Sequence, residues 1–152
     1  MEEAKKSVHK ILASSYLSYF LLILGGLFFD IFFPLKFSFP NGQVLTIIFF
    51  AVGPALILWA QHSSHKFEKI KEKTGSLSFG TGPYKYLRNP TQLGLVILVA
   101  GYAFASGAAV LFIAVGIAYL ISNIFFRKHE SVLEARYGEH YSKYRDSVRK
   151  II

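Results

Sequence analysis

The chain has 152 residues, of which 53% are hydrophobic, 16% are aromatic and only 17% are charged. Because charged residues make up about a quarter of a typical soluble domain, this composition excludes an ordinary soluble protein and predicts membrane helices. The net charge of +8 suits a nucleic-acid partner, but 15 Phe residues and long uncharged runs exclude that partner. The lack of Cys excludes a disulfide framework, a thiolate metal site and a cysteine nucleophile.

The first two membrane helices are predicted at residues 12–33 and 44–60. The first stretch has 22 residues, and the helical rise carries it across about 33 Å, which is enough to cross the hydrocarbon core. It is also longer than the apolar core of a cleaved signal peptide, so we expect it to be retained. The second stretch contains Gly53-Pro54, and a proline inside a helix predicts a kink there.

The other two membrane helices are predicted at residues 90–105 and 108–126, after a charged loop at residues 61–89. Ser106-Gly107 forms a tight turn between them, and small residues in this hairpin let helices approach closely in lipid. A polar tail, residues 127–152, follows the hairpin. The predicted fold class is therefore all-α, with one membrane domain of four transmembrane helices and a C-terminal amphipathic helix.

Positive charge is unevenly divided between the two predicted membrane faces. The N-terminal tail, the loop 61–89 and the C-terminal tail share one face and together hold 16 of the 17 Lys and Arg residues. Cytoplasmic segments of membrane proteins are enriched in these residues. We therefore expect a multi-pass protein with both termini in the cytoplasm.

Asn89-Pro90 marks the start of the third membrane helix. An Asn side chain before a helix accepts a hydrogen bond from a backbone N–H of the first turn, and proline suits the first helical position. The other free N–H groups of that turn favour an anion, which Arg88 would also attract. Two interpretations stay open: the pair only caps the helix, or the helix start binds a carboxylate or phosphate.

Glu130 is the candidate functional residue of the C-terminal tail. Two roles stay open for a carboxylate this close to the membrane surface: an ion pair with Arg88 or Arg127, or the binding of a ligand ammonium group. The helix that carries Glu130 is predicted to end at Gly138. No metal site is predicted, because the five His residues are too scattered to form a set of ligands.

A helical face is predicted in the tail from the spacing of Tyr137, Tyr141, Tyr144 and Val148. We expect this helix to lie on the membrane surface. Its tyrosines would occupy the interface, and its cations would point toward anionic head groups.

Two motifs flank the predicted hairpin. The first reads GPYKYLRNPTQLG from Gly82 to Gly94, and the second reads HESVL from His129, followed by YGEHYSKY from Tyr137. In order and spacing they resemble the motifs of the isoprenylcysteine carboxyl methyltransferase family, its bacterial and archaeal relatives, and the phospholipid methyltransferases. The resemblance covers about half of the chain, from Ser76 to Arg149.

The resemblance implies an integral membrane enzyme that uses S-adenosyl-L-methionine to methylate a lipid or a prenylated, hydrophobic acceptor. It implies that the cofactor lies between the hairpin and the C-terminal tail, against Ser76, Leu77, Ser78, Phe79, Tyr84, Asn89, Pro90, Gln92, His129 and Glu130. Catalytic roles fall on Arg88, Arg127 and Glu130. Of these, Arg127 lies nearest to the position of the family arginine that holds a substrate carboxylate.

The chain departs from the family pattern at Asn89, Gln92 and His129, where the family has His, Tyr and Glu. Asn89 cannot titrate, and His129 lacks the negative charge that Glu would place beside a cationic cofactor. Two functions other than methyl transfer stay open. One is a non-catalytic membrane scaffold with the same fold, and the other is an NADPH-dependent enzyme similar to the much longer sterol reductases.

Overall fold

The computed structural model describes the backbone of residues 2–74 and 80–148, and the side chains of residues 10–66 and 80–148. These residues confirm the all-α fold class. They form α1 (Glu2–Phe32), α2 (Gly42–Thr74), the short 3-10 helix η1 (Gly82–Lys85), α3 (Pro90–Ser106), α4 (Ala109–Tyr137) and α5 (Glu139–Ser147).

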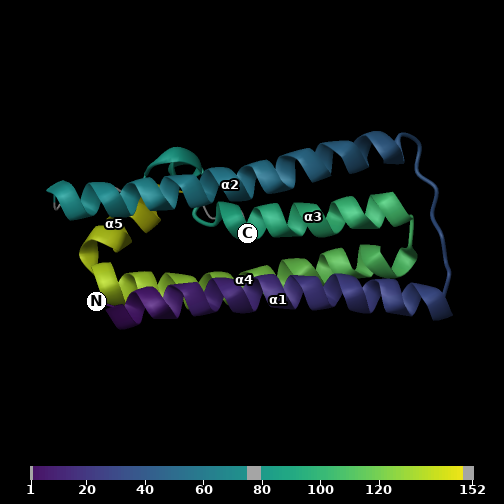
Figure 1. Cartoon of the computed structure of the whole chain (residues 1–152), viewed down its shortest axis with the longest axis horizontal. Coiled ribbons are helices and arrows are strands. Elements are labelled where there is room, and N and C mark those ends of the chain that lie inside the picture. The colour runs from purple at the N-terminus through teal and green to yellow at the C-terminus, as the bar shows by residue number, and fades with distance from the viewer. Residues whose placement is uncertain (1, 75–79, 149–152) are drawn as a thin grey trace.

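The four long helices form a bundle in which the α3–α4 hairpin is central (Figure 1). α2 packs along α3, α3 packs against α4, and α1 packs along α4. The end of α2, η1, the start of α3, the end of α4 and α5 all lie at one end of the bundle. The two segments that carry the sequence motifs therefore meet in space, although the hairpin separates them in the chain.

Within the described residues, three helical segments are long and apolar enough to cross a membrane, namely Lys10–Phe32, Gly42–Lys66 and Ala109–Tyr137. α3 is equally apolar but has only 17 residues. Large apolar side chains such as Phe20, Ile47 and Ile113 are more than half exposed on the outer faces. Exposure of this kind is expected where a helix faces lipid rather than water.

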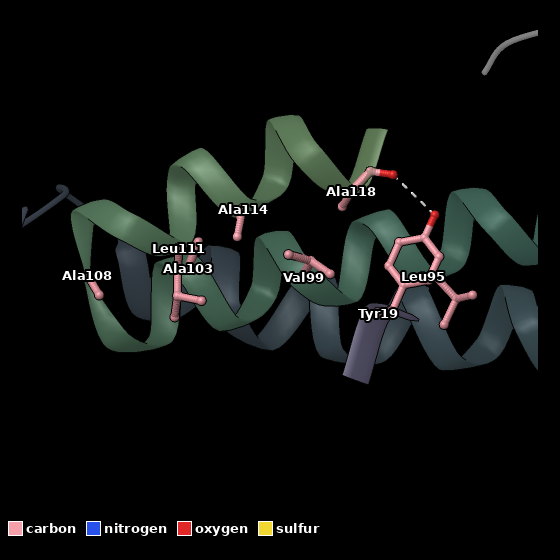
Figure 2. Close-up of a cluster of buried hydrophobic side chains, with 8 residues drawn as sticks. All are labelled: Tyr19, Leu95, Val99, Ala103, Ala108, Leu111, Ala114 and Ala118. Carbon is pink, nitrogen blue, oxygen red and sulfur yellow. Dashed lines mark hydrogen bonds between the residues drawn. The ribbon is translucent and has the colours of Figure 1, made fainter. Parts of the chain in front are cut away.

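The buried core lies between α1, α3 and α4 (Figure 2). Small side chains recur in it, and it consists of Tyr19, Leu95, Val99, Ala103, Ala108, Leu111, Ala114 and Ala118. Because lipid tails are as apolar as these side chains, the helices gain little from burial and associate through close packing instead. The predicted packing role of small hairpin residues is confirmed for Ala103, Ala108, Ala114 and Ala118, whereas Gly116 is exposed.

Gly94 shows how close α2 and α3 approach. A Cβ atom added to Gly94 would lie 2.7 Å from Ile57 Cγ1 and 2.8 Å from the backbone oxygen of Gly53. Only a residue without a side chain fits between the two helices there. Pro54, which follows Gly53 in the chain, lies inside one continuous helix.

The end of the bundle away from the motifs is closed by a short backbone bridge. Lys36, in the connection between α1 and α2, pairs with Ala108 in the predicted α3–α4 turn. The bridge contains hydrogen bonds from Phe37 N to Gly107 O (2.7 Å) and from Ala109 N to Leu35 O (2.9 Å). Gly107 has φ +64, and a Cβ atom there would lie 2.6 Å from Phe37 O, so glycine is required at this turn.

One predicted boundary is wrong. Residues 61–74 were expected in a loop, but α2 continues through them to Thr74. The apolar run ends near Ala60, whereas the helix does not, because residues 61–74 contain neither Gly nor Pro and are rich in Lys and Glu, which are good helix formers. The end of an apolar run therefore does not indicate where a helix ends.

Candidate active site

An ion pair between Arg88 and Glu130 lies at the centre of the motif-bearing end of the bundle. Arg88 Nη1 is 2.7 Å from Glu130 Oε1, and the two side chains are only 12% and 18% exposed. The guanidinium group also lies over the Phe126 ring, 5.4 Å from its centroid. Phe126 and Glu130 are four residues apart on α4, which places both within reach of Arg88. Of the two partners predicted for Glu130, the structure shows Arg88, while Arg127 is exposed on α4.

α5 folds back onto this ion pair. The predicted break at Gly138 is confirmed, and its φ of +52 and ψ of −129 are accessible to glycine. Tyr141 is 2% exposed, and its hydroxyl donates a long hydrogen bond of 3.4 Å to Glu130 Oε1. Farther along, Arg145 Nη1 lies 2.6 Å from Glu134 Oε1 and holds α5 against α4.

The prediction that Tyr137, Tyr141, Tyr144 and Val148 form one face of a helix is wrong. Tyr137 ends α4 and Val148 follows α5, so the four residues do not form one helical face. Tyr141 is instead buried and donates to Glu130, while the Tyr144 hydroxyl donates to the backbone oxygen of Tyr84. Their spacing correctly indicated a helix, but spacing alone does not indicate which neighbour that helix covers.

Tyr84 connects α2, η1 and α5. Its hydroxyl lies 2.9 Å from Ser64 Oγ on α2, and its backbone oxygen accepts a hydrogen bond of 2.7 Å from the Tyr144 hydroxyl. Gly82 makes this arrangement possible, because it has φ +56 and a Cβ atom there would overlap Ser63. The short η1 is therefore fixed between α2 and α5, directly before Arg88.

Burial keeps the phenols of this site protonated. It raises the pKa of Tyr84, Tyr141 and Tyr144 above the ordinary value, and the negative charge of Glu130 raises the pKa of Tyr141 further. At neutral pH all three hydroxyls are protonated, and those of Tyr141 and Tyr144 donate to Glu130 Oε1 and to the backbone oxygen of Tyr84.

α3 begins at Pro90 as predicted, but the Asn89 side chain does not cap it. The backbone oxygen of Asn89 accepts from Leu93 N at 3.2 Å, whereas its side chain makes no cap hydrogen bond. The φ of −137 and ψ of 63 at Asn89 differ from the extended conformation of a usual N-cap. Asn89 Nδ2 and the neighbouring Arg88 Nε are buried donors without a hydrogen-bond partner in the described part of the chain.

The other predicted site residues are divided between this end and the bundle interior. Pro90 is fully buried, and His129 is half-buried next to Glu130. Gln92 is 3% exposed, and its Oε1 accepts a hydrogen bond of 3.0 Å from Tyr19 on α1. The predicted pocket residues Ser76, Leu77, Ser78 and Phe79 lie outside the described residues.

Sequence reasoning missed three residues of this region: Ser64, Tyr144 in its contact with Tyr84, and Tyr19. Ser64 lay in the segment that was expected to be a loop, so no helical face was assigned to it. Tyr19 is one of several hydroxyl-bearing residues at the start of a long apolar stretch. No local signal marks such a residue, because its partners are 73 and 99 positions away in the chain.

The fold and the site define a small membrane protein that gathers ionic and hydrogen-bonding groups at one end of an apolar helix bundle. The phospholipid methyltransferase family model matches residues 42–140, and the chain belongs to this family. Neither a curated protein nor a solved structure matches the chain significantly. The match spans α2 through the start of α5, and it leaves α1 outside.

Membership of this family confirms the predicted class of function. Its members are membrane enzymes that use S-adenosylmethionine as methyl donor, so the chain is an integral, multi-pass membrane methyltransferase with a lipid substrate. The match favours methyl transfer over the reductase alternative. The isoprenylcysteine carboxyl methyltransferases, which the motifs also resemble, are a related family.

Proposed function

We propose that the protein methylates the amine of a phospholipid head group at the end of the bundle built from η1, the start of α3, the end of α4 and α5. The observation that carries this proposal is the buried Arg88–Glu130 pair beside two unpartnered donors, Asn89 Nδ2 and Arg88 Nε. Buried polar groups normally have partners, and two neighbouring exceptions in an enzyme suggest that a ligand completes them.

These groups fit the chemistry of S-adenosylmethionine. The methionine part of the cofactor carries a carboxylate, which suits the donors of Arg88 and Asn89, and two cationic groups, which suit the carboxylate of Glu130. We propose that Arg88, Asn89 and Glu130 hold this part of the cofactor. The motif resemblance adds Tyr84, Pro90 and His129 to this pocket and implies the same for residues 76–79, which lie outside the described residues, whereas the Gln92 side chain is hydrogen-bonded to Tyr19 on α1.

The residues of the chain act mainly by positioning and by excluding water. When bound, S-adenosylmethionine supplies an electrophilic methyl group on a sulfonium. The Arg88–Glu130 pair keeps the loop before α3 at a fixed place on α4, and α5 covers the pair with protonated tyrosines. The head-group amine has to release its proton to water at this end of the bundle before it can attack, and alignment of the neutral amine would then supply most of the acceleration, on the order of 7–11 kcal/mol at best.

The charges of the site favour an amine acceptor over a carboxylate acceptor. A carboxylate acceptor would need a further cation beside it, because Arg88 is paired with Glu130 and its remaining donor is assigned above to the cofactor carboxylate. Position 125, where the related carboxyl methyltransferases have an arginine, is Phe, and the nearby Arg127 is exposed. This distribution supports a phospholipid amine rather than a prenylcysteine carboxylate.

We further propose that the site faces the cytoplasm. The motif-bearing end of the bundle holds almost all of the Lys and Arg residues, as the positive-inside rule expects of a cytoplasmic face. A water-soluble cofactor would reach the site from that side, while the acceptor would remain in the membrane.

Calorimetry with S-adenosylhomocysteine on the detergent-solubilised protein tests the cofactor site. We expect Glu130→Gln to weaken binding by about tenfold, because one charge of a largely buried site is lost. The matched control is Glu139→Gln, since Glu139 pairs with Lys143 on the exposed side of α5. Equal affinity of wild type and Glu130→Gln would remove Glu130 from the cofactor site.

Methyl transfer in mixed micelles tests the acceptor. We expect labelled methyl groups to appear on phosphatidylethanolamine and not on a prenylcysteine. Transfer to the prenylcysteine carboxylate alone would refute the amine assignment, while absence of S-adenosylhomocysteine binding by folded wild-type protein would refute the cofactor site itself.

A further inference from the structure

α1 lies outside the region matched by the family model, yet one of its faces is buried against the α3–α4 hairpin. This face includes Ser15, Tyr19 and Gly26. Ser15 is fully buried, and a Cβ atom on Gly26 would overlap the Leu111 side chain. Small residues one turn before and two turns after Tyr19 thus let α1 approach the hairpin, and Tyr19 projects from this face into the core.

The Tyr19 hydroxyl joins α1 to both helices of the hairpin. Tyr19 is 2% exposed. Its hydroxyl oxygen lies 3.0 Å from Gln92 Oε1 on α3 and 3.2 Å from the backbone oxygen of Ala118 on α4. Figure 2 shows the contact with Ala118. A phenol has only one proton. Rotation of the Gln92 amide by half a turn would direct its NH₂ group at the phenol oxygen, and the phenol proton would then serve Ala118. In either orientation Tyr19 bridges α3 and α4.

Both contacts lie on elements that carry the proposed cofactor site. Gln92 belongs to the first turn of α3 and follows Arg88 by four residues, so a shift of this turn moves Arg88 as well. Ala118 belongs to the buried stripe of α4 that ends at Phe126, the residue beneath the Arg88 guanidinium. Tyr19 fixes the position of Gln92 relative to Ala118. It therefore also affects where Arg88 contacts α4.

We propose that Tyr19 is a positioning residue for methyl transfer, which acts through Gln92 to hold the first turn of α3 in the place where Arg88 and Asn89 meet Glu130. The proposal rests on the proposed function of that site. It assigns Gln92 to the support of the site rather than to direct cofactor contact. It also makes α1 part of the functional architecture, although the family match begins only at residue 42.

The membrane setting makes this contact consequential. No water is available in the hydrocarbon region to replace a lost hydrogen-bond partner. Removal of the Tyr19 hydroxyl would leave the buried Gln92 amide without its partner, and an unpartnered buried group is destabilising. The first turn of α3 would then shift until the amide finds another partner.

Tyr19→Phe, compared with Tyr16→Phe, tests the proposal. Tyr16 is on the same helix, but its hydroxyl accepts from Gln61 Nε2 at 3.1 Å, so this hydrogen bond joins α1 to α2 rather than to the hairpin. Both variants remove one hydroxyl and keep the ring. The measurements are the Kd for S-adenosylhomocysteine and the kcat and KM for lipid methylation, at temperatures at which every variant is folded.

We expect Tyr19→Phe to raise the Kd and lower kcat, each by about tenfold, which is the effect of one buried hydrogen bond. We expect the KM for the lipid to stay unchanged and Tyr16→Phe to match wild type within about twofold. Gln92→Leu removes the other partner of the Tyr19–Gln92 hydrogen bond and so tests the same contact. Because the two residues act as one unit, the double variant is expected to be no worse than the poorer single variant.

Three results would overturn the proposal. Equal losses in Tyr19→Phe and Tyr16→Phe would indicate general loosening of α1. Additive losses in the double variant would show that Tyr19 and Gln92 act independently. A loss in Gln92→Leu without one in Tyr19→Phe would place Gln92 directly against the cofactor. If wild-type protein itself bound no S-adenosylhomocysteine, the proposed function would fail before this question arose.

Discussion

Replacing Asn89 with Ala is expected to change stability and cofactor affinity in opposite directions. A side chain that caps a helix contributes about 1 kcal/mol, which Ala removes. In this structure the Asn89 side chain makes no cap hydrogen bond, and its Nδ2 is buried without a partner. An unpartnered buried donor destabilises a protein by about 1–3 kcal/mol. Asn89→Ala therefore leaves the free energy of unfolding unchanged or raises it by about 1 kcal/mol, after allowance for the small cavity.

The same variant is expected to bind S-adenosylhomocysteine about tenfold more weakly, because the donor that has no protein partner is the one offered to the ligand carboxylate. Denaturant unfolding in detergent and calorimetry on the same preparation measure the two quantities. Asn123→Ala is a suitable control, since the Asn123 side chain donates at 3.0 Å to Tyr119 O, one turn back on α4. A loss of about 1 kcal/mol in stability with unchanged affinity would show that Asn89 is a cap and nothing more.

Two further predictions concern packing and pH. Gly94→Ala forces a Cβ atom to within 2.7 Å of Ile57 Cγ1 and is expected to destabilise the bundle by about 1–3 kcal/mol. The control is Gly116→Ala, because a Cβ atom at Gly116 would have nothing within 4 Å. In the same unfolding assay this control is expected to leave the free energy of unfolding unchanged or to raise it. Because burial raises the folded pKa of Tyr141 and Tyr144 above 10.0, the stability they contribute is present below pH 10 and is lost as the pH rises toward their folded values. The free energy of unfolding, measured as the pH rises above 10, is expected to fall less steeply in Tyr144→Phe than in wild type. The same slope in both proteins would contradict the raised folded pKa of Tyr144.

Much of the fold follows from local signals in the sequence. Apolar runs located the membrane helices, Ser106-Gly107 located the hairpin turn, and Pro90 located the start of α3. Each of these signals reflects a backbone or burial preference of a few neighbouring residues, so no long-range information was needed. The charged end of α2 shows the limit of this reasoning, because hydropathy reports the surroundings of a helix and not its hydrogen bonding.

The contacts of the site were less predictable. Arg88 and Arg127 were both possible ion-pair partners of Glu130. The packing of α3 on α4 brings Arg88 to Glu130. The direction of the α5 tyrosines depends on the backbone at Gly138, whose φ of +52 turns the chain back toward α4. The contact of Tyr19 with Gln92 joins residues 73 positions apart. These features arise from the tertiary arrangement and leave no periodic pattern in the sequence.

The unequal lengths of the helices explain why the candidate site forms where it does. α2 has 33 residues and α4 has 29, whereas α3 has only 17, which corresponds to about 50, 44 and 26 Å of helix. At the motif-bearing end, α2 and α4 therefore continue past the start of α3, and residues 80–89 lie beside these helices rather than at a bare membrane surface. A phospholipid head group is held at the membrane interface by its acyl chains, and S-adenosylmethionine arrives from water. We propose that the reactants meet at this depth, where the short third helix would place Arg88 and Asn89.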